Sequence, residues 1–205
     1  TIRTSTPLRR AIPITKDITV VIDAGHGKMP DGNFSGARDG NVYEDEIVLA
    51  LAREIKANNQ NDHIKILLSR NSDVDLHQRV EFARKNNADL FISLHVGAPD
   101  PANQPTENRT SGFEIMVSNK EPFYQKESEL LGSVLQQELN EVHYTYPKLL
   151  KRNTGIWVID KNVCASVLVE CGYITDPADR AFITKKENYH LVAGKILNAI
   201  ERFAS

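Results

Sequence analysis

Three ionisable side chains stand at the carboxyl ends of apolar runs: His26 after 18–23, His95 at the end of 89–95, and Glu170 at the end of 166–170. Short runs rich in β-branched and apolar residues predict buried strands. In an open α/β sheet, ligands bind at the carboxyl ends of the strands. If these strands are parallel, the three side chains meet at one edge of the sheet, where they could bind a metal ion or transfer protons.

A fourth candidate, Glu44, begins a predicted helix at 44–57, directly after a glycine-rich loop at 24–42. The helix would hold this carboxylate rigidly while the loop returns it to the same edge of the sheet. Acidic residues in a first helical turn often only compensate for the helix dipole. Asp45 and Glu46 fit that interpretation equally well. The pattern therefore leaves open which of the three carboxylates takes part in a site.

Two histidines and one carboxylate form a common catalytic zinc set, in which water takes the open fourth position. The same ligand types also hold non-haem iron. Hydrolysis needs nothing beyond the metal, whereas oxygen chemistry needs room for a cosubstrate that no pattern here indicates. The sequence lacks H-E-x-x-H, a phosphate-binding loop and a dinucleotide fingerprint. We therefore favour zinc, with His26 and His95 among its ligands.

The elements needed to position these residues alternate along the chain, which predicts a single α/β domain. We expect a roughly six-stranded, mostly parallel sheet with helices on both faces. The expected strands are 18–23, 64–68, 89–95, 113–117, 155–159 and 166–170. The expected helices are 44–57, one that Asp75 and Gln78 cap, 124–140, one that starts at Asp176-Pro177, and 188–203. Leu76, Leu130 and Leu191 are expected on their core-facing sides. Residues 1–16 are expected to form an arm or linker and 17–205 the domain.

Composition excludes several classes of protein. A net charge of −2 over 205 residues argues against a nucleic-acid or anionic-lipid binder, because both require a basic excess. No apolar run is long enough to span a bilayer, so membrane insertion is not expected. Cys164 and Cys171 match no zinc or redox spacing and are expected to be small buried apolar residues.

Several blocks of the sequence resemble the zinc-dependent N-acetylmuramoyl-L-alanine amidases, the Amidase_3 family. Segment 22–55, IDAGHGKMPDGNFSGARDGNVYEDEIVLALAREI, is similar to the family's opening signature, and 69–95 resembles its middle block. RNTGIWVI at 152–159 and VLVECGYITDPAD at 167–179 resemble the closing blocks. The resemblance covers about 18–203. It implies that His26, Glu44 and His95 bind Zn2+ and that Glu170 is the catalytic base.

The reaction implied by the resemblance is hydrolysis of the amide between N-acetylmuramic acid and the L-alanine of the peptidoglycan stem peptide. The implied location is the cell envelope, periplasmic or secreted, as for an autolysin. A non-catalytic peptidoglycan-binding module and a zinc hydrolase acting on another amide are the alternatives. The family's binding modules are absent from this sequence, so an activator or wall-anchoring module is expected outside it.

Two departures from the family pattern bear on the substrate groove. His95 is followed by Val96-Gly97-Ala98, where relatives have alanine and then asparagine or aspartate. The loop at 98–111 is too short and too rich in proline for the inhibitory helix that some relatives insert, so an open site is expected. We also expect Asp23 to orient the His26 ring, since metal-bound imidazoles usually donate their other N–H to an acceptor.

Overall fold

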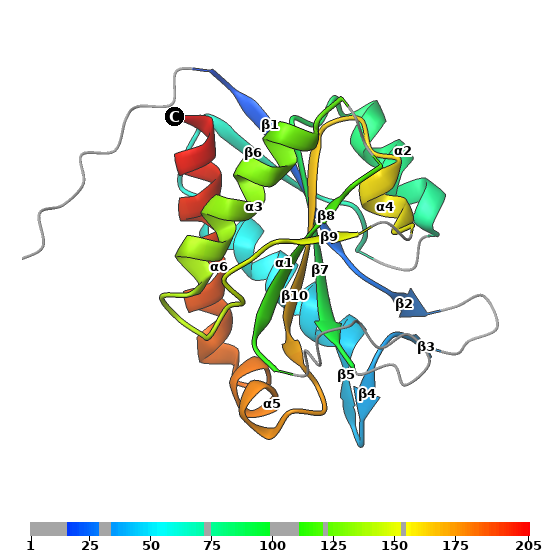
Figure 1. Ribbon diagram of the computed structural model, residues 1–205, viewed down its shortest axis with the longest axis vertical. Helices are drawn as coiled ribbons and strands as arrows, with labels where there is room; N and C mark the ends of the chain where they lie inside the picture. Colours follow the sequence, from blue (N-terminus) through cyan, green and yellow to red (C-terminus); the bar gives the residue numbers. More distant parts are fainter. Residues whose placement is uncertain (1–15, 29–33, 72–74, 99–110, 121–122, 153–154) are drawn as a thin grey trace, which may run out of the picture.

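The computed structural model describes residues 16–28, 34–71, 75–98, 111–120, 123–152 and 155–205 (Figure 1). Its main feature is a six-stranded sheet in the order β6-β1-β7-β10-β8-β9. The strands are β1 (Ile18–Ala24), β6 (Ile64–Leu68), β7 (Leu90–Gly97), β8 (Phe113–Ser118), β9 (Leu150–Arg152) and β10 (Ala165–Tyr173). The first four in the sheet order are parallel, β8 runs antiparallel to β10, and β9 is parallel to β8. The predicted α/β fold with a mostly parallel sheet is confirmed.

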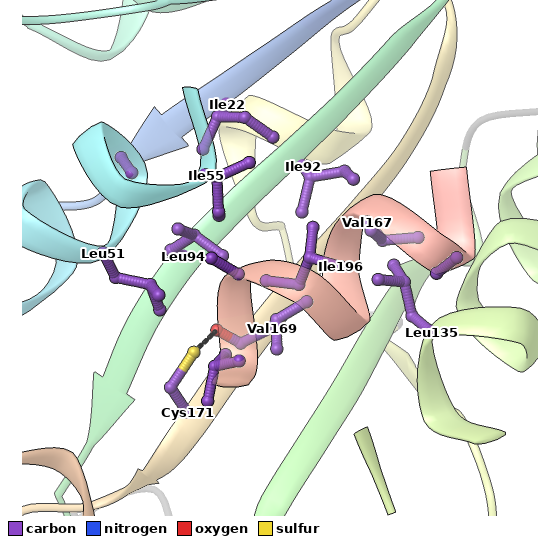
Figure 2. Close-up of a cluster of buried hydrophobic side chains, with 14 of the residues drawn as sticks. Ile22, Leu51, Ile55, Ile92, Leu94, Leu135, Val167, Val169, Cys171 and Ile196 are labelled. Carbon is purple, nitrogen blue, oxygen red and sulfur yellow. Dashed lines mark hydrogen bonds between the residues drawn. The ribbon is translucent and has the colours of Figure 1, made fainter. Parts of the chain in front are cut away.

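Helices cover both faces of the sheet, as Figure 1 shows. They are α1 (Glu44–Asn58), α2 (Leu76–Lys85), α3 (Gln125–Leu139), α4 (Trp157–Asp160), α5 (Pro177–Ile183) and α6 (Lys186–Ala204). The larger core cluster lies between the sheet and α1, α3 and α6. In Figure 2, Ile196 of α6 lies among Ile92, Val167 and Val169 of the sheet. A smaller cluster joins the other face to α2 and α4 through Ala83, Val158 and Ile159.

The described parts of the glycine-rich loop after β1 contain more regular structure than a loop prediction implies. It contains β2 (Gly27–Lys28) paired with β3 (Phe34–Ser35), and β4 (Arg38–Asp39) paired with β5 (Val42–Tyr43). Both short pairs are antiparallel. They carry the chain from the end of β1 to the start of α1, and thus set where Glu44 lies.

The two predicted helix starts are confirmed. The Asp75 side chain accepts from the Gln78 N–H, and the Gln78 side chain accepts from the Asp75 N–H, which completes a capping box. At α5, Asp176 accepts from the N–H groups of Ala178 and Asp179, with Pro177 at the first helical position. These caps satisfy backbone donors that a helix cannot pair by itself.

The prediction of a strand at 155–159 is wrong. Residues 157–160 form the short helix α4, and the sheet takes β9 at 150–152 instead. A short apolar run fits a buried strand and a buried helical turn equally well. Here its residues Val158 and Ile159 are buried in a helical turn.

The predicted inner faces of three helices are also partly wrong. Leu76, Leu130 and Leu191 are 53%, 55% and 50% exposed. Leu130 and Leu191 each precede a buried apolar residue, Leu131 and Val192. Adjacent positions on a helix point about 100° apart, so only one of each pair faces the core.

The described helices include none that is long and apolar enough to cross a membrane. Cys164 and Cys171 are both buried free thiols, as predicted. Burial, together with the charges of Glu170 and Glu44, raises the pKa of the Cys171 thiol, which therefore stays protonated. The expected arm is 1–16, of which 1–15 are not described, and the expected open site depends on the loop at 98–111, of which 99–110 are not described.

Candidate metal centre

The strand register brings the sequence-predicted residues to one edge of the sheet. Ala24, the last residue of β1, pairs with Leu94, and His95 pairs with Glu170 on the neighbouring strand β10. His26 follows β1 by two residues. The convergence inferred from parallel strands is therefore observed.

Glu44 reaches this edge from the first turn of α1, where it is 3% exposed. Its Oε1 accepts from the Val96 N–H at 2.9 Å, and its Oε2 accepts from the Ala37 N–H at 2.6 Å. The Glu44 N–H donates in turn to the Ala37 carbonyl at 3.0 Å. Backbone groups from β7 and from the loop before α1 thus fix both carboxylate oxygens.

His26 and His95 both lie beside the same oxygen of the Glu44 carboxylate. His26 Nε2 is 3.3 Å and His95 Nδ1 is 3.1 Å from Glu44 Oε1. One ligand atom from each residue lies within 4.8 Å of the others. Donors about 2.1 Å from a tetrahedral ion are about 3.4 Å apart. The donor types, and the two separations between histidine nitrogen and glutamate oxygen, are close to those around a small ion such as zinc.

The charge state of Glu44 suits a ligand. Burial by itself acts to raise the pKa of Glu44. Hydrogen bonds with His26 and His95, together with their charges, outweigh burial and hold the pKa well below its usual range. Asp45 differs, because burial, opposed by Arg70, gives a net rise in its pKa. Of the three acidic residues at this helix start, Glu44 is the one that both histidines contact. This contact distinguishes Glu44 from Asp45 and Glu46, which residue spacing alone could not do.

Two glycines provide the space for this arrangement. A Cβ on Gly25 would lie 2.4 Å from the His95 ring, and a Cβ on Gly36 would lie 2.8 Å from both Glu44 Oε2 and His26 Cγ. His26 itself has a φ of 58°, a conformation that costs energy for a residue with a Cβ. Backbone strain at His26 is thus part of how its ring is aimed at Glu44.

Asp23 does not orient the His26 ring as expected. Its carboxylate, 1% exposed, accepts from Ser69 Oγ, from Arg79 Nη1 at 2.8 Å and from Ser93 Oγ at 2.7 Å. The residue beside His26 Nδ1 is Ser35, whose Oγ lies 3.3 Å away. Residue spacing could not predict the contact of Ser35 with His26 or that of Arg79 with Asp23. Both contacts depend on the positions of the loop and α2 in the folded chain.

Arg79 links this network to the candidate metal site. Its guanidinium donates to the carbonyls of Ala24 and His26 as well as to Asp23. The arginine is 2% exposed and comes from the first turns of α2. The strained backbone at His26 is therefore held by a buried ion pair.

Glu170 has a different environment from Glu44. Within the described structure, its Oε2 is buried and has no hydrogen-bond partner. Burial, reinforced by the carboxylates of Glu44 and Glu114, raises the pKa of Glu170 well above its ordinary value, and Arg152 acts in the opposite direction. A carboxyl group of raised pKa beside a cluster of metal-ligand type is suited to accept and return a proton.

Sequence reasoning missed Glu114, which is 1% exposed and faces Glu170 across the β10–β8 pair. Tyr173 Oη lies 3.3 Å from Glu114 Oε2. A Cβ on Gly97 would lie 2.7 Å from the Tyr173 ring, so the departure from the family pattern at Gly97 makes room for this tyrosine. A charged residue inside the apolar run FEIMV was the signal available for Glu114.

Comparisons with known proteins agree with this architecture. The family model of the N-acetylmuramoyl-L-alanine amidases (Amidase_3) matches residues 20–202. An uncharacterised Bacillus subtilis protein, YqiI, is 29% identical over 98% of this chain and 91% of its own length. The germination-specific N-acetylmuramoyl-L-alanine amidase of Bacillus subtilis is 25% identical over 94% of this chain and 82% of its own length.

Among solved structures, the CwlD amidase from Clostridioides difficile, in complex with the GerS lipoprotein, superposes with a TM-score of 0.75. It is 23% identical, and the match covers 91% of this chain and 98% of that one. At this level of identity the match shows a shared fold.

Proposed function

The chain belongs to the N-acetylmuramoyl-L-alanine amidase family, and from this premise we propose that it is a zinc-dependent hydrolase of peptidoglycan. The bond cut is the amide between the lactyl group of N-acetylmuramic acid and the L-alanine of the stem peptide. His26, Glu44 and His95 hold the ion, and Glu170 transfers the proton. One observation carries the proposal. Three donor atoms, one each from His26, Glu44 and His95, lie within 4.8 Å of one another near Glu170, a carboxyl group of raised pKa.

His26, Glu44 and His95 would hold a zinc ion, which would supply polarisation of the scissile carbonyl and a lowered pKa, toward about 7, for the attacking water. The ligand residues do no proton chemistry. Glu44 keeps its charge because two backbone N–H groups and two imidazoles stabilise the carboxylate. His26 is oriented through its strained backbone and its contact with Ser35.

Glu170 takes the proton from the attacking water at its carboxylate and delivers it to the nitrogen of the leaving L-alanine. Its buried Oε2 has no competing donor among the described residues, so that oxygen is available for the water. The charge of an ion at the neighbouring ligands favours the ionised form that a base needs, and burial favours the protonated form that an acid needs. This balance suits a group that must serve in both forms.

Two wider parts of the proposal rest on relatives. The matched amidases act on cell-wall material, so we place this chain in the cell envelope, periplasmic or secreted. The Clostridioides difficile amidase is in complex with a lipoprotein. By analogy, we propose that an activator or wall-anchoring module outside this chain acts together with it.

The test is digestion of purified peptidoglycan by zinc-loaded and by chelator-treated protein, with the products identified by mass spectrometry. The proposal expects stem peptides with a new L-alanine amino terminus, lost with chelator and restored by zinc. Intact peptidoglycan in all conditions, despite bound zinc, would favour a binding module. Cleavage of simple amides without cleavage of peptidoglycan would favour a different zinc hydrolase.

A further inference from the structure

The only tryptophan of the chain, Trp157, is partly exposed at the start of α4. The residue is 39% exposed, and the His77 ring of α2 lies against the Trp157 ring, with centroids 4.7 Å apart and planes tilted by 53°. Leu76, next to His77, is 53% exposed. Trp157, His77 and Leu76 are called the α2–α4 platform below.

Two sets of contacts place the α2–α4 platform beside the metal centre. On the α2 side, Arg79 donates to the His26 carbonyl, so the first turn of α2, which also carries His77, lies against the loop that holds His26. On the α4 side, Val158 and Ile159 follow Trp157 directly and belong to the same buried cluster as Leu168.

Leu168 lies two residues before Glu170, about 7 Å along β10. Residues i and i+2 of a strand share a face, so Glu170 lies on the same face of the sheet as α2 and α4. Figure 1 shows these two helices side by side on that face. The platform therefore borders the surface on which the proposed substrate must lie.

The groups around the ring are polar and of mixed charge. Lys161 Nζ lies 5.9 Å from the centre of the Trp157 ring, and His77 Nδ1 lies 3.9 Å from the Asp75 carboxylate. A partly exposed aromatic ring with hydrogen-bonding groups close to it suits a ligand with an apolar face and hydroxyl groups. The local charges do not favour an anion, which argues against the carboxylate-bearing stem peptide as occupant.

We propose that the α2–α4 platform binds sugar rings of the glycan strand, the N-acetylated hexosamine units next to the muramoyl residue whose amide is cut. This inference rests on the proposed function, because it assigns one side of the same groove to the glycan. Stable protein–protein interfaces bury about 800 Å² on each partner. Three side chains offer much less, which disfavours a second copy of this chain as occupant.

The first test is independent of catalysis. Because the chain contains one tryptophan, fluorescence excited at the long-wavelength edge of its absorption, where tyrosine does not absorb, reports on the platform. Titration of the full chain with chitotetraose, a neutral N-acetylglucosamine oligomer, is expected to give a saturable change in emission, and His77→Ala is expected to weaken binding several-fold. No change with chitotetraose, or an equal change with a sugar-free stem peptide, would overturn the proposal.

The second test uses the zinc-loaded enzyme and two substrates, a disaccharide-linked stem peptide and an N-lactoyl stem peptide without sugar. Trp157→Ala is expected to lower kcat/KM about tenfold on the first and to leave the second unchanged. Equal losses on both substrates would assign Trp157 a structural role and overturn the proposal. If the wild-type enzyme cuts neither substrate, the proposed function fails, while the fluorescence result still decides the platform.

Phe123→Ala is the matched control. Phe123 is an aromatic residue with 84% exposure that follows the end of β8. Since β8 runs antiparallel to β10, it ends at the opposite edge of the sheet from Glu170. This variant is expected to behave as wild type in both tests. Self-association of the wild type that Trp157→Ala abolishes would instead assign the platform to a protein contact and overturn the glycan proposal.

Discussion

Asp23 and Glu170 are carboxylates near the carboxyl ends of parallel strands, yet their surroundings are opposite. Asp23 is buried and accepts hydrogen bonds from Ser69, Arg79 and Ser93. These three partners are buried as well. Glu170 has a buried Oε2 without a hydrogen-bond partner in the described part of the chain, and its pKa is raised.

The difference separates residues that support the site from the residue that we propose does the chemistry. A buried charge with full hydrogen bonding strengthens the structure around it, whereas one without partners lowers stability. Proteins keep such unfavourable groups mainly where function requires them. The fully bonded Asp23 network holds the backbone at His26, and the unsatisfied oxygen of Glu170 is free to accept a proton.

The largest expected effect is on activity at Glu170. Glu170→Ala removes the proposed proton carrier and is expected to lower kcat on peptidoglycan by about 10²–10⁴-fold. Zinc content, measured by mass spectrometry of the metal, is expected to stay at one ion per chain, because the ligand set is intact. Release of stem peptides at near wild-type rate would remove Glu170 from its role.

Asp23 is expected to show the reverse pattern, with its main effect on stability. Asp23→Ala leaves the Arg79 guanidinium buried without its carboxylate, and breaking a buried pair costs about 3–5 kcal/mol. Denaturant unfolding measures the loss. A variant as stable as wild type would show that the Asp23–Arg79 pair does not support the fold as we describe it.

The packing around the ligands is tested by Gly25→Ala. Its Cβ would lie 2.4 Å from the His95 ring, so the ring must move, and zinc affinity is expected to fall about 10–100-fold. Competition with a chelator measures the affinity.

Gly194→Ala in α6 is the matched control for this substitution. A Cβ at Gly194 meets no atom within 4 Å. The substitution is expected to leave zinc affinity unchanged and to stabilise the helix by about 0.5–1 kcal/mol. Unchanged zinc affinity in both variants would contradict the close fit at His95.

A further prediction for Glu170 is a small gain in stability. In chelator-treated protein at pH 7, Glu170→Gln is expected to raise the free energy of unfolding by about 1 kcal/mol, because an unfavourable buried charge is removed.

The pH dependence of this gain gives a sharper check. The folded pKa of Glu170 lies above its unfolded value, so the ionised group destabilises the fold increasingly as pH rises from the unfolded pKa through the folded one. The gain from Glu170→Gln should therefore shrink as pH falls toward about 4. A gain independent of pH would point to packing as its cause.

Much of this arrangement was predictable from the sequence. Strands at 18–24, 64–68 and 90–97 are apolar runs with clear ends, so the convergence of His26 and His95 followed from parallel pairing. The cap residues Asp75 and Asp176 marked helix starts because their side chains act locally.

What could not be predicted depends on contacts distant in sequence. The partners of Asp23 come from 46 to 70 residues away, and nothing in local spacing reveals them. The run at 155–159 was misassigned because an apolar segment this short carries no distinguishing period. Residue spacing alone left Glu44, Asp45 and Glu46 open, whereas the family resemblance implied Glu44, the one that both histidines contact.

The central claim is a division of labour in which Glu44 holds the metal and Glu170 does not. Crystals of the zinc-loaded Glu170→Gln variant, measured at the zinc absorption edge, test it most directly. The account predicts one anomalous peak bound by His26, Glu44 and His95, with the residue-170 side chain outside the ligand shell. A peak coordinated by the side chain at position 170, or zinc bound without Glu44, would contradict it.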